Sequence, residues 1–390
     1  MFKNIFIDYT TGIAKSSHTF HGGFSFTYWL TQELLEKYNS INILIKKEQE
    51  TLFDDKFLDE FRSKINFIHI ENIKKYTFPN NSVLIMPLIP NYRLKIIKEI
   101  KKINNNIKIN VVIHGIRNLD LIKFDKYDKY YFNNIFYSFP LIFWFYKLTK
   151  GIVEYFTIKY FLHYADLVIT VSNSTLQKLA NINKKVNRIT LFHQSSNLLK
   201  INPTYLEDNK KYILFLNAKR HEKNFIRGLV AFLKYKIESS DNEIYLYVTG
   251  FNSILEKNIN KVLNKSELLL FKEYVKTFDY LSDHELVNLY SNSLFLLYTS
   301  KSEGYGIPIL ESAFFGKPIL SSYLCSIPEI LGSLVYYINP YDIRSIVNGL
   351  YHMIKNENYN LRKNSISKYK EIIIKRNSIE KQIVLSEIVE

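Results

Sequence analysis

The sequence predicts an α/β protein built from two doubly wound parallel sheets, each in a domain of its own. A chain of 390 residues fits two to three domains of roughly 150 residues each. Its hydrophobic content of 47% is enough for sizeable cores and argues against global disorder. Short apolar runs alternate with stretches of helical period, and a polar stretch at residues 194–209 separates two comparable halves. Domains are therefore expected at residues 1–200 and 201–390, and a final helix from about residue 372 could pack back on the first domain.

The first half contains short apolar runs that predict buried strands. These runs are Phe2–Asp8, Ile41–Ile45, Phe67–Ile70, Val83–Met86, Ile109–His114, Leu167–Val171 and Ile189–Phe192. Stretches of helical period lie between the early runs, at residues 24–38, 56–64 and 92–102. Strands that alternate with helices indicate a parallel sheet with helices on both faces.

Two places in the first half have the chemistry of a ligand site. The first strand leads into a loop with Gly22 and Gly23 and then into a helix, whose free N–H groups and dipole attract phosphate. This loop lacks the G-x-G-x-x-G fingerprint, so binding of NAD is disfavoured. His114 ends a strand at the sheet edge where such folds bind ligands, which makes it a site candidate. A histidine there is also common as a satisfied polar group, and that alternative stays open.

Residues 130–164 form a segment dense in aromatic side chains. Its longest nearly uncharged run, residues 130–146, falls short of the roughly 20 apolar residues that a membrane-spanning helix needs. Lys147, Lys150 and Lys159 interleave with the aromatics, as in segments that lie on an anionic bilayer surface. A pair of buried helices is the alternative, and the sequence leaves both open.

The second half shows the same alternation and opens with a basic loop. Its predicted strands are Tyr212–Asn217, Ile244–Val248, Tyr274–Phe278, Leu294–Tyr298, Pro318–Leu320 and Leu334–Ile338. The first strand runs into the loop 218–224, sequence AKRHEKN, and then into a helix to about Ile237. Such cations could hold a diphosphate, because arginine binds its oxygens with a fork of donors and lysine acts as a point charge. A solvated charge cluster would look the same. Ser282 and Glu285 predict a capping box, which we interpret as structural.

The stretch Thr299–Glu329 carries the strongest chemical signal. A glycine loop follows a strand and precedes a helix opened by a proline, so its amides and the helix start attract phosphate. One carboxylate precedes the loop and another is expected in the first helical turn. Because carboxylates repel phosphate, they are expected to accept hydrogen bonds from sugar hydroxyl groups, as a nucleotide sugar would provide. Glycine turns before helices are also ordinary in α/β proteins. The residues concerned are Glu303, Gly304, Gly306, Pro308 and Glu311.

The net charge and the cysteine count exclude fewer classes of function than the motifs do. The formal net charge of +15 suits an anionic membrane, an anionic substrate or nucleic acid, but it also follows from a general lysine bias. No recognised nucleic-acid motif accompanies the charge, so nucleic acid is not expected as a partner. Cys325 is the only cysteine, which excludes an intrachain disulfide and a cysteine-based zinc site and is compatible with the cytoplasm. The N-terminal apolar run is interpreted as a strand, being too short for a signal peptide.

Four segments of the second half together resemble the retaining glycosyltransferases of family GT4, which have the GT-B fold. They follow one another in the order and spacing of that family, from about Tyr212 to Asp342. The first half is similar only loosely, through HGGFSFTYWL, VVIHGIR and DLVITVSNST. The four segments are ILFLNAKRHEKN, FDYLSDHELVNLYSNSLFLLYTS, SEGYGIPILESAFFGKPILSS with its E-x7-E element, and SIPEILGSLVYYINPYD. The resemblance implies two Rossmann-like domains that face each other across a cleft.

The resemblance implies catalytic roles for four residues. Glu303 would contact the donor sugar, and His114 would lie near the reacting sugar. Arg220 and Lys223 would neutralise the nucleoside diphosphate as it leaves. Many relatives have Gly-Arg after the basic-loop strand, whereas this chain has Asn-Ala, so the arginine role is assigned to Arg220 from its spacing to Lys223.

A larger set is implied to bind the donor. Glu311 would accept bonds from the ribose hydroxyl groups, and the stretch from Phe278 to Leu281 would lie along the base. Residues 325–327, Cys-Ser-Ile, stand where relatives often have Gly-Gly, so a ligand contact from that loop is not assigned. The implied donor-binding residues are Gly22, Gly23, Asn217, Phe278, Leu281, Gly304, Tyr305, Gly306, Ile307, Pro308 and Glu311.

The sequence shows no Asp-x-Asp metal motif, so we expect metal-independent transfer with cationic side chains and helix termini stabilising the leaving group. The reaction would retain configuration by front-side attack, with a UDP- or GDP-linked sugar as co-substrate and no other cofactor. The expected acceptor is a saccharide or lipid-linked saccharide of a surface polysaccharide, handled in the cytoplasm or on the inner face of the plasma membrane. A sugar-nucleotide epimerase on the same fold and a non-catalytic carbohydrate-binding protein are the alternatives.

Overall fold

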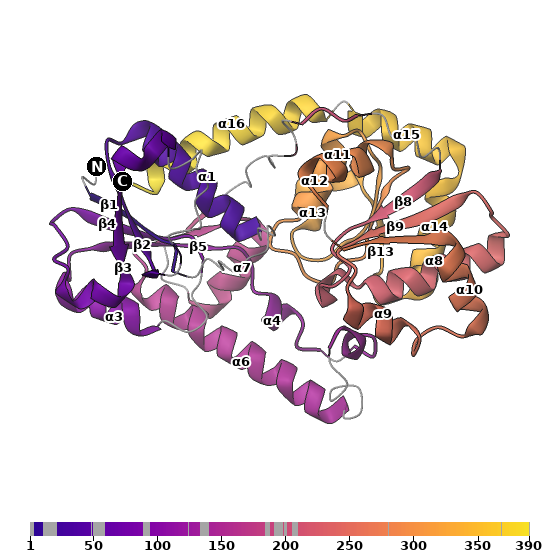
Figure 1. Ribbon diagram of the computed structural model, residues 1–390, viewed down its shortest axis with the longest axis horizontal. Coiled ribbons are helices and arrows are strands. Elements are labelled where there is room, and N and C mark those ends of the chain that lie inside the picture. Colours follow the sequence, from indigo (N-terminus) through magenta and orange to yellow (C-terminus); the bar gives the residue numbers. More distant parts are fainter. Residues whose placement is uncertain are drawn as a thin grey trace. The chain divides into compact units, whose positions relative to one another are not determined.

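In a computed structural model, the chain forms two compact units. Figure 1 shows the helices and strands of both units, coloured along the sequence. Unit 1 contains Met1–Ile116, Ile152–Gln194 and Asn377–Glu390, and unit 2 contains Arg117–Gly151 and Ser195–Arg376. Relative to the expected boundary near residue 200, residues 117–151 therefore belong with the second unit and residues 377–390 with the first. The structure describes residues 4–10, 22–47, 49, 59–88, 94–123, 125–132, 140–183, 188–190, 198, 201–204, 210–279, 281–367 and 369–389.

Unit 1 is built on a parallel sheet in the order β3-β2-β1-β4-β5-β6-β7. Each strand coincides with a predicted apolar run, within two residues at the described ends, so the sequence prediction is confirmed. The strands are β1 Asn4–Asp8, β2 Ile41–Ile45, β3 Ile65–His69, β4 Ser82–Met86, β5 Lys108–Ile113, β6 Leu167–Thr170 and β7 Arg188–Thr190. Its helices include α1 Gly22–Lys37, α3 Leu94–Ile103 and α7 Asn173–Ile182, and residues 62–64 and 70–75 form 3-10 turns.

The core of unit 1 lies against β1, the strand at which the order of the sheet reverses. Ile5 and Ile7 of β1 are fully buried with Leu30 and Leu34 of α1. The last helix, α16 Lys370–Glu387, contributes Val384 to the same cluster. Alternate strand positions face one side of a sheet, so the apolar run of β1 serves both faces.

The end of the chain is also tied to this sheet by a polar contact. Asn110 of β5 donates from Nδ2 to the carbonyl oxygen of Ile388 at 2.8 Å. Asn110 is buried, and an amide buried without a partner would destabilise the fold. The contact therefore fixes the chain end on unit 1.

Unit 2 is built on a second parallel sheet, in the order β10-β9-β8-β11-β12-β13. Its strands are β8 Lys211–Phe215, β9 Ile244–Thr249, β10 Val275–Phe278, β11 Leu296–Tyr298, β12 Ile319–Ser322 and β13 Tyr336–Ile338. Its helices include α8 Phe225–Ser239, α9 Ser253–Ile259, α10 Lys265–Tyr274, α11 Asp283–Asn292, α12 Ile307–Phe314, α13 Ile327–Leu331, α14 Ile343–Ile354 and α15 Asn356–Ser367. The six predicted strands and the capping box of Ser282 and Glu285 at α11 are confirmed.

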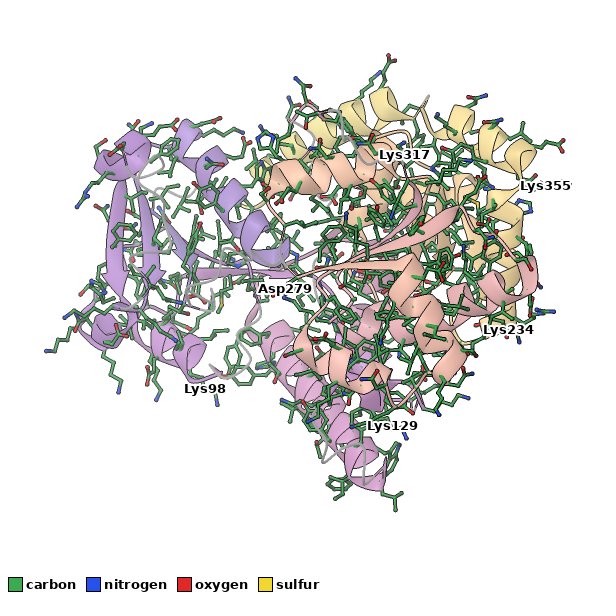
Figure 2. All side chains as sticks on the ribbon, turned by 45° about the vertical axis from the view of Figure 1, so that its right-hand side comes forward. Lys98, Lys129, Lys234, Asp279, Lys317 and Lys355 are labelled. Carbon is green, nitrogen blue, oxygen red and sulfur yellow. The ribbon has the colours of Figure 1, made fainter. Side chains whose placement is uncertain are left out.

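Apolar side chains fill the space between this sheet and its helices, while lysines such as Lys234 lie on the outside. Phe215, Leu297 and Leu320 of the sheet are buried with Leu229 of α8 in one cluster. Figure 2 labels Lys234 of α8, whose side chain is 48% exposed. An exposed lysine of this kind contributes positive charge without implying a partner.

Residues 117–151 join unit 2 through a one-turn helix α4 Arg117–Asp120, a 3-10 turn η4 Asp128–Tyr131 and the start of α6 Pro140–Tyr164. Tyr131 lies in the hydrophobic cluster of unit 2, and its hydroxyl accepts from the backbone N–H of Ile226 at 2.8 Å. That N–H lies in the first turn of α8, where no intrahelical acceptor exists. This loop between β5 and β6 is therefore part of the second unit's core.

Helix α6 has one buried face and one exposed apolar face. Phe143 and Phe161 are fully buried, so part of the aromatic segment is core. The exposed face carries Leu141, Ile142, Trp144, Phe145, Ile152, Val153 and Phe156. The described part of 130–164 thus contains one long helix instead of the alternative pair. None of the described helices is long and apolar enough to cross a membrane.

Candidate active site

The glycine loop after β11 leads into α12 as the sequence predicts. Gly306 is the N-cap of α12 with φ +107°, and Pro308 lies in the first turn. The backbone angle of Gly306 favours glycine, and a Cβ atom there would come within 2.9 Å of Ile330 Cδ1, so the isoleucine side chain would have to shift in any larger variant. Glu311 is the fifth residue of α12, which places it in the second turn and corrects the expected first-turn position.

Glu303 of this loop forms a buried ion pair with Lys223. Its Oε1 accepts from Lys223 Nζ at 2.6 Å and from Ser300 Oγ at 2.5 Å. Burial raises the pKa of Glu303, but the charges of Lys223 and Arg220 outweigh it, and the net pKa is lowered. Burial also lowers the pKa of Lys223, although Glu303 opposes that shift. The structure thus brings together two predicted catalytic residues that are 80 positions apart in the sequence.

Tyr298, the last residue of β11, completes this cluster. Lys223 Nζ donates to the Tyr298 hydroxyl at 2.6 Å. Tyr298 is almost fully buried, and burial together with the nearby Glu303 carboxylate keeps its pKa well above the usual value. The phenol therefore stays neutral and holds the ammonium group at the end of the strand.

The basic loop is held by two asparagines and one buried carboxylate. Asn217 and Asn224 have φ values of +58° and +60°, the left-handed region that asparagine tolerates better than most residues. Arg220 Nε donates to Glu222 Oε1 at 2.6 Å. Burial raises the pKa of Glu222, but the charges of Arg117 and Arg220 outweigh burial and lower the pKa to about 2. The loop therefore presents Arg220 as a guanidinium held by an ionised glutamate.

Hydrogen bonds to backbone carbonyl oxygens join the basic loop to the segment that leads into the glycine loop. The backbone N–H of Lys301 donates to the carbonyl oxygen of Glu222 at 2.8 Å, and Ser300 Oγ donates to the same oxygen at 3.1 Å. Thr299 Oγ1 donates to the carbonyl oxygen of Lys223 at 2.9 Å. The positions of Arg220, Lys223 and Glu303 are thus set by one connected scaffold.

The remaining donor-binding candidates of unit 2 gather at the carboxyl ends of its strands. Glu311 is buried, and its Oε2 accepts from the Tyr290 hydroxyl at 2.6 Å. Ser326 Oγ donates to the carbonyl oxygen of Tyr305 at 2.7 Å, which ties α13 to the glycine loop. Phe278 ends β10, and its carbonyl oxygen accepts from the backbone N–H of Phe251 at 3.0 Å. Gly304, Ile307, Pro308 and Leu281 are partly exposed.

Unit 1 carries the other predicted residues. Gly22 and Gly23 are the first two residues of α1, whereas the loop before them, residues 11–21, lies outside the described part. His114 follows β5, its Nε2 lies 2.9 Å from the Pro87 carbonyl oxygen, and its ring meets that of Phe26 at 5.1 Å. Burial lowers the pKa of His114 to about 4, so the ring is neutral at physiological pH.

Sequence reasoning missed several residues of the cluster. Tyr298 ends an apolar run and is indistinguishable there from a core tyrosine, and Ser300 lies in a loop of small polar residues. Arg117 contacts Glu222 from a position more than a hundred residues away, which no local pattern reveals. The asparagine at position 217 was noted, and its left-handed backbone explains why it can replace glycine there.

No group of three or more histidine, cysteine, aspartate or glutamate side chains in the described ranges could hold a metal ion. Two parallel α/β sheets, with a glycine loop and a basic loop at the carboxyl ends of the second, define the GT-B fold. Residues 199–371 match the family model of glycosyl transferases group 1. This part of the chain is similar to that family over most of unit 2.

Comparison with curated proteins supports the same family. The chain is 28% identical over 179 residues to the O-antigen chain mannosyltransferase RfbU of Salmonella typhimurium, covering 46% of this chain and 48% of that one. It is 25% identical over 135 residues to the O-antigen chain mannosyltransferase B of Escherichia coli, covering 35% and 34% of the two chains. The matches therefore span between a third and a half of these relatives' length.

Solved structures show the fold over nearly the whole chain. Anabaena Alr3699/HepE, in complex with UDP and glucose, has a TM-score of 0.66 at 12% identity and covers 98% of this chain and 99% of its own. Sucrose-phosphate synthase of Thermosynechococcus elongatus has a TM-score of 0.65 at 14% identity and covers 98% of this chain and 100% of its own.

Proposed function

We propose that this protein is a GT4-type hexosyltransferase that uses a nucleoside-diphosphate sugar as donor. The buried contact of Glu303 with Lys223, beside Arg220 and the start of α12, carries the proposal. It combines an ionised carboxylate for sugar hydroxyl groups with cations for a diphosphate, which is what a nucleotide sugar requires. The names of the two mannosyltransferase relatives favour mannose as the sugar and a surface polysaccharide as the product.

The proposed reaction retains configuration and needs no metal ion. The bond between the anomeric carbon and the diphosphate breaks on the same face on which the acceptor oxygen bonds to that carbon. The acceptor proton passes to the leaving diphosphate oxygen, so no protein base is required. Arg220, Lys223 and the N–H groups that open α12 stabilise the negative charge that develops on the leaving group.

Glu303 then acts as an orienting group and not as a covalent nucleophile. Its Oε1 is engaged by Lys223 and Ser300, which fixes the carboxylate and stabilises its charge. Glu311, held by the Tyr290 hydroxyl, binds the ribose hydroxyl groups. His114 is neutral, so it can lie near the reacting sugar as a hydrogen-bond partner without adding a charge.

Release of nucleoside diphosphate from a panel of GDP-mannose, UDP-glucose and other sugar nucleotides tests the proposal. With a mannose-terminated saccharide as acceptor, we expect release of GDP together with a lengthened saccharide. Lys223→Met should abolish release, whereas Lys234→Met, on the exposed face of α8, should leave it unchanged (Figure 2). Lasting conversion of the donor sugar to an epimer without net release would favour the epimerase alternative. If the protein binds none of the sugar nucleotides in the panel, the proposal is wrong.

We also propose that α6 lies on the cytoplasmic face of an anionic membrane, where lipid-linked acceptors are found. Leu141, Phe145 and Phe156 are 81%, 62% and 61% exposed, and Lys150 and Lys159 flank them on the same helix. Aromatic and aliphatic side chains beside lysines suit the interface of a bilayer. The double variant Phe145→Ser/Phe156→Ser should therefore no longer sediment with phosphatidylglycerol vesicles. The variant Leu361→Ser, which changes an exposed leucine of α15, should sediment as the wild type does. Equal binding of all three proteins to vesicles would contradict this location.

A further inference from the structure

We infer that Arg117 and Asp120, on the one-turn helix α4, are positioning residues for the proposed transfer reaction, so this inference rests on the proposed function. Arg117 Nη1 lies 3.2 Å from Glu222 Oε1. Asp120 Oδ2 accepts from Ser302 Oγ at 2.8 Å. One turn of helix thus contacts both loops that carry the proposed catalytic residues.

The contact of Arg117 controls how much positive charge Arg220 offers. Glu222 Oε1 is shared by the two guanidinium groups, since Arg220 Nη2 lies 2.5 Å from it. Two arginines against one carboxylate leave positive charge in excess beside the basic loop. Without Arg117, Glu222 would neutralise Arg220, and its attraction for a departing diphosphate would fall.

The contact of Asp120 acts on the second loop. Ser302 immediately precedes Glu303, so the bond from Ser302 Oγ fixes the backbone at the proposed sugar-binding carboxylate. Cys325 Sγ lies 3.5 Å from the same Asp120 oxygen, and Cys325 has a left-handed backbone with φ +56°. The carboxylate therefore joins the glycine loop to the turn before α13.

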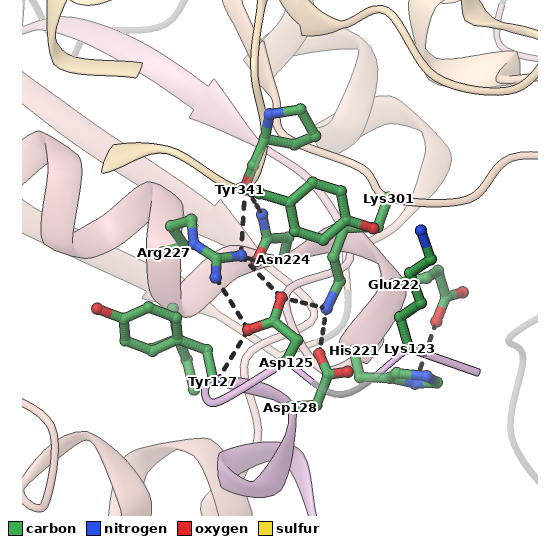
Figure 3. Close-up of polar contacts among 12 residues, drawn as sticks. Lys123, Asp125, Tyr127, Asp128, His221, Glu222, Asn224, Arg227, Lys301 and Tyr341 are labelled. Carbon is green, nitrogen blue, oxygen red and sulfur yellow. Dashed lines mark hydrogen bonds and ion pairs between the residues drawn. The ribbon is translucent and has the colours of Figure 1, made fainter. Parts of the chain in front are cut away.

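A buried network of charges fixes the segment that carries α4. Asp125 accepts two bonds of 2.9 Å from the guanidinium of Arg227 and lies 3.2 Å from Lys301 Nζ, and Figure 3 shows it between the two cations. Asp128 pairs with Lys301 and with Lys147, the latter at 2.8 Å. All five side chains are at least nine-tenths buried.

This network and α4 have separable roles. The network lies in the interior and anchors the segment, so its loss should be felt as instability. The Arg117 side chain is 48% exposed, and Glu222 keeps Arg220 as a partner when Arg117 is removed. Loss of Arg117 should therefore change turnover more than stability.

The test uses the full chain with GDP-mannose, or with the sugar nucleotide of the panel that the wild type turns over. Arg117→Met should lower kcat by about 10- to 100-fold with little change in Tm, because small displacements of catalytic groups cost that much. Arg117→Lys should recover part of the loss by keeping the charge. Lys123→Met, which removes an exposed lysine from the same segment, is the matched control and should behave as wild type.

A double-mutant cycle tests whether Arg117 affects kcat through Glu222 or by another route. If Arg117 acts through Glu222, Arg117→Met should cause no further loss in a Glu222→Gln background. Asp120→Ala provides a second variant and should lower kcat independently of Glu222. Wild-type kcat in Arg117→Met, or losses that multiply in the double mutant, would overturn the role of Arg117 while the proposed function stands. Absence of turnover in the wild type would overturn both.

Discussion

Lys223 is held by two partners, and Tyr298 is the one that the sequence did not reveal. An ammonium group has three donors, and within the described residues Tyr298 and Glu303 take two of them. A third donor is then available for a phosphate oxygen. Tyr298→Phe keeps the buried ring but removes the hydroxyl that orients Lys223. The value of kcat should then fall by about 10- to 100-fold, since a hydrogen bond to a charged group contributes about 1.5–3 kcal/mol.

Steady-state kinetics with the preferred sugar nucleotide measure this effect. Tyr290→Phe is the matched control for removing a buried hydroxyl, and because that hydroxyl binds Glu311 it should raise KM for the donor instead of lowering kcat. An unchanged kcat in Tyr298→Phe would show that Glu303 alone positions Lys223.

His114 should make the stability of unit 1 depend on pH. Burial lowers the pKa of His114 from about 6.5 to about 4, so the unfolded chain binds a proton in this window that the folded chain does not. The free energy of unfolding should therefore fall as the pH is lowered from 6.5 to 4, by about 3 kcal/mol in total. Urea unfolding across this range should show a flatter profile for His114→Gln. His163→Gln removes an exposed histidine and should keep the wild-type profile; identical slopes in all three would refute the assignment.

At the level of single residues, the sequence predicted the site residues that lie within short local motifs. Glu303, Lys223 and the glycine loop come together as expected because strand ends of one parallel sheet meet at one edge. The partners of these residues come from long-range packing, so Tyr298, Arg117 and Glu222 could not be assigned from spacing. Glu311 lies one residue further into the helix than expected, because the helix begins at Ile307, directly after the left-handed Gly306, and not at Pro308.

The elements themselves were predictable where the apolar pattern is strong. Each buried strand coincides with an apolar run of the sequence, since strands covered on both faces need apolar residues at successive positions. The segment 117–151 was placed in the wrong half, because its attachment depends on pairs such as Asp125 with Arg227, 102 residues apart. Sequence order favours assigning a loop to the strands that flank it, and only the tertiary contacts show otherwise.

The buried network of this segment should dominate its stability. Asp125→Asn should lower the free energy of unfolding by about 3–5 kcal/mol, because Arg227 and Lys301 would keep their charges in the interior with one carboxylate fewer. Lys211 and Glu243 form a pair of similar length, 2.6 Å, but their side chains are 61% and 72% exposed. Lys211→Met should therefore cost less than about 1 kcal/mol. Equal losses in urea unfolding would mean that water reaches the Asp125 network.

The whole chain passes between the two units four times, at residues 116/117, 151/152, 194/195 and 376/377. A cut near residue 200 would separate the catalytic loops from the segment that completes their unit. The C-terminal residues, which carry Val384 into the cluster of unit 1, would be separated from their sheet in the same way. Neither unit is therefore a contiguous piece of sequence.

This interleaving predicts that a fragment of residues 195–376 is incomplete and can be complemented in trans. Without residues 117–151, the Ile226 N–H loses the Tyr131 hydroxyl, and Arg227 and Lys301 lose both aspartates. The isolated fragment should unfold at lower urea concentration than unit 2 of the intact chain, and a peptide of residues 117–151 should raise its midpoint by binding the folded state. The same peptide with Asp125→Asn should raise it less, because it leaves Arg227 without its carboxylate. A midpoint that does not respond to either peptide would show that the second sheet and its helices are stable without this segment.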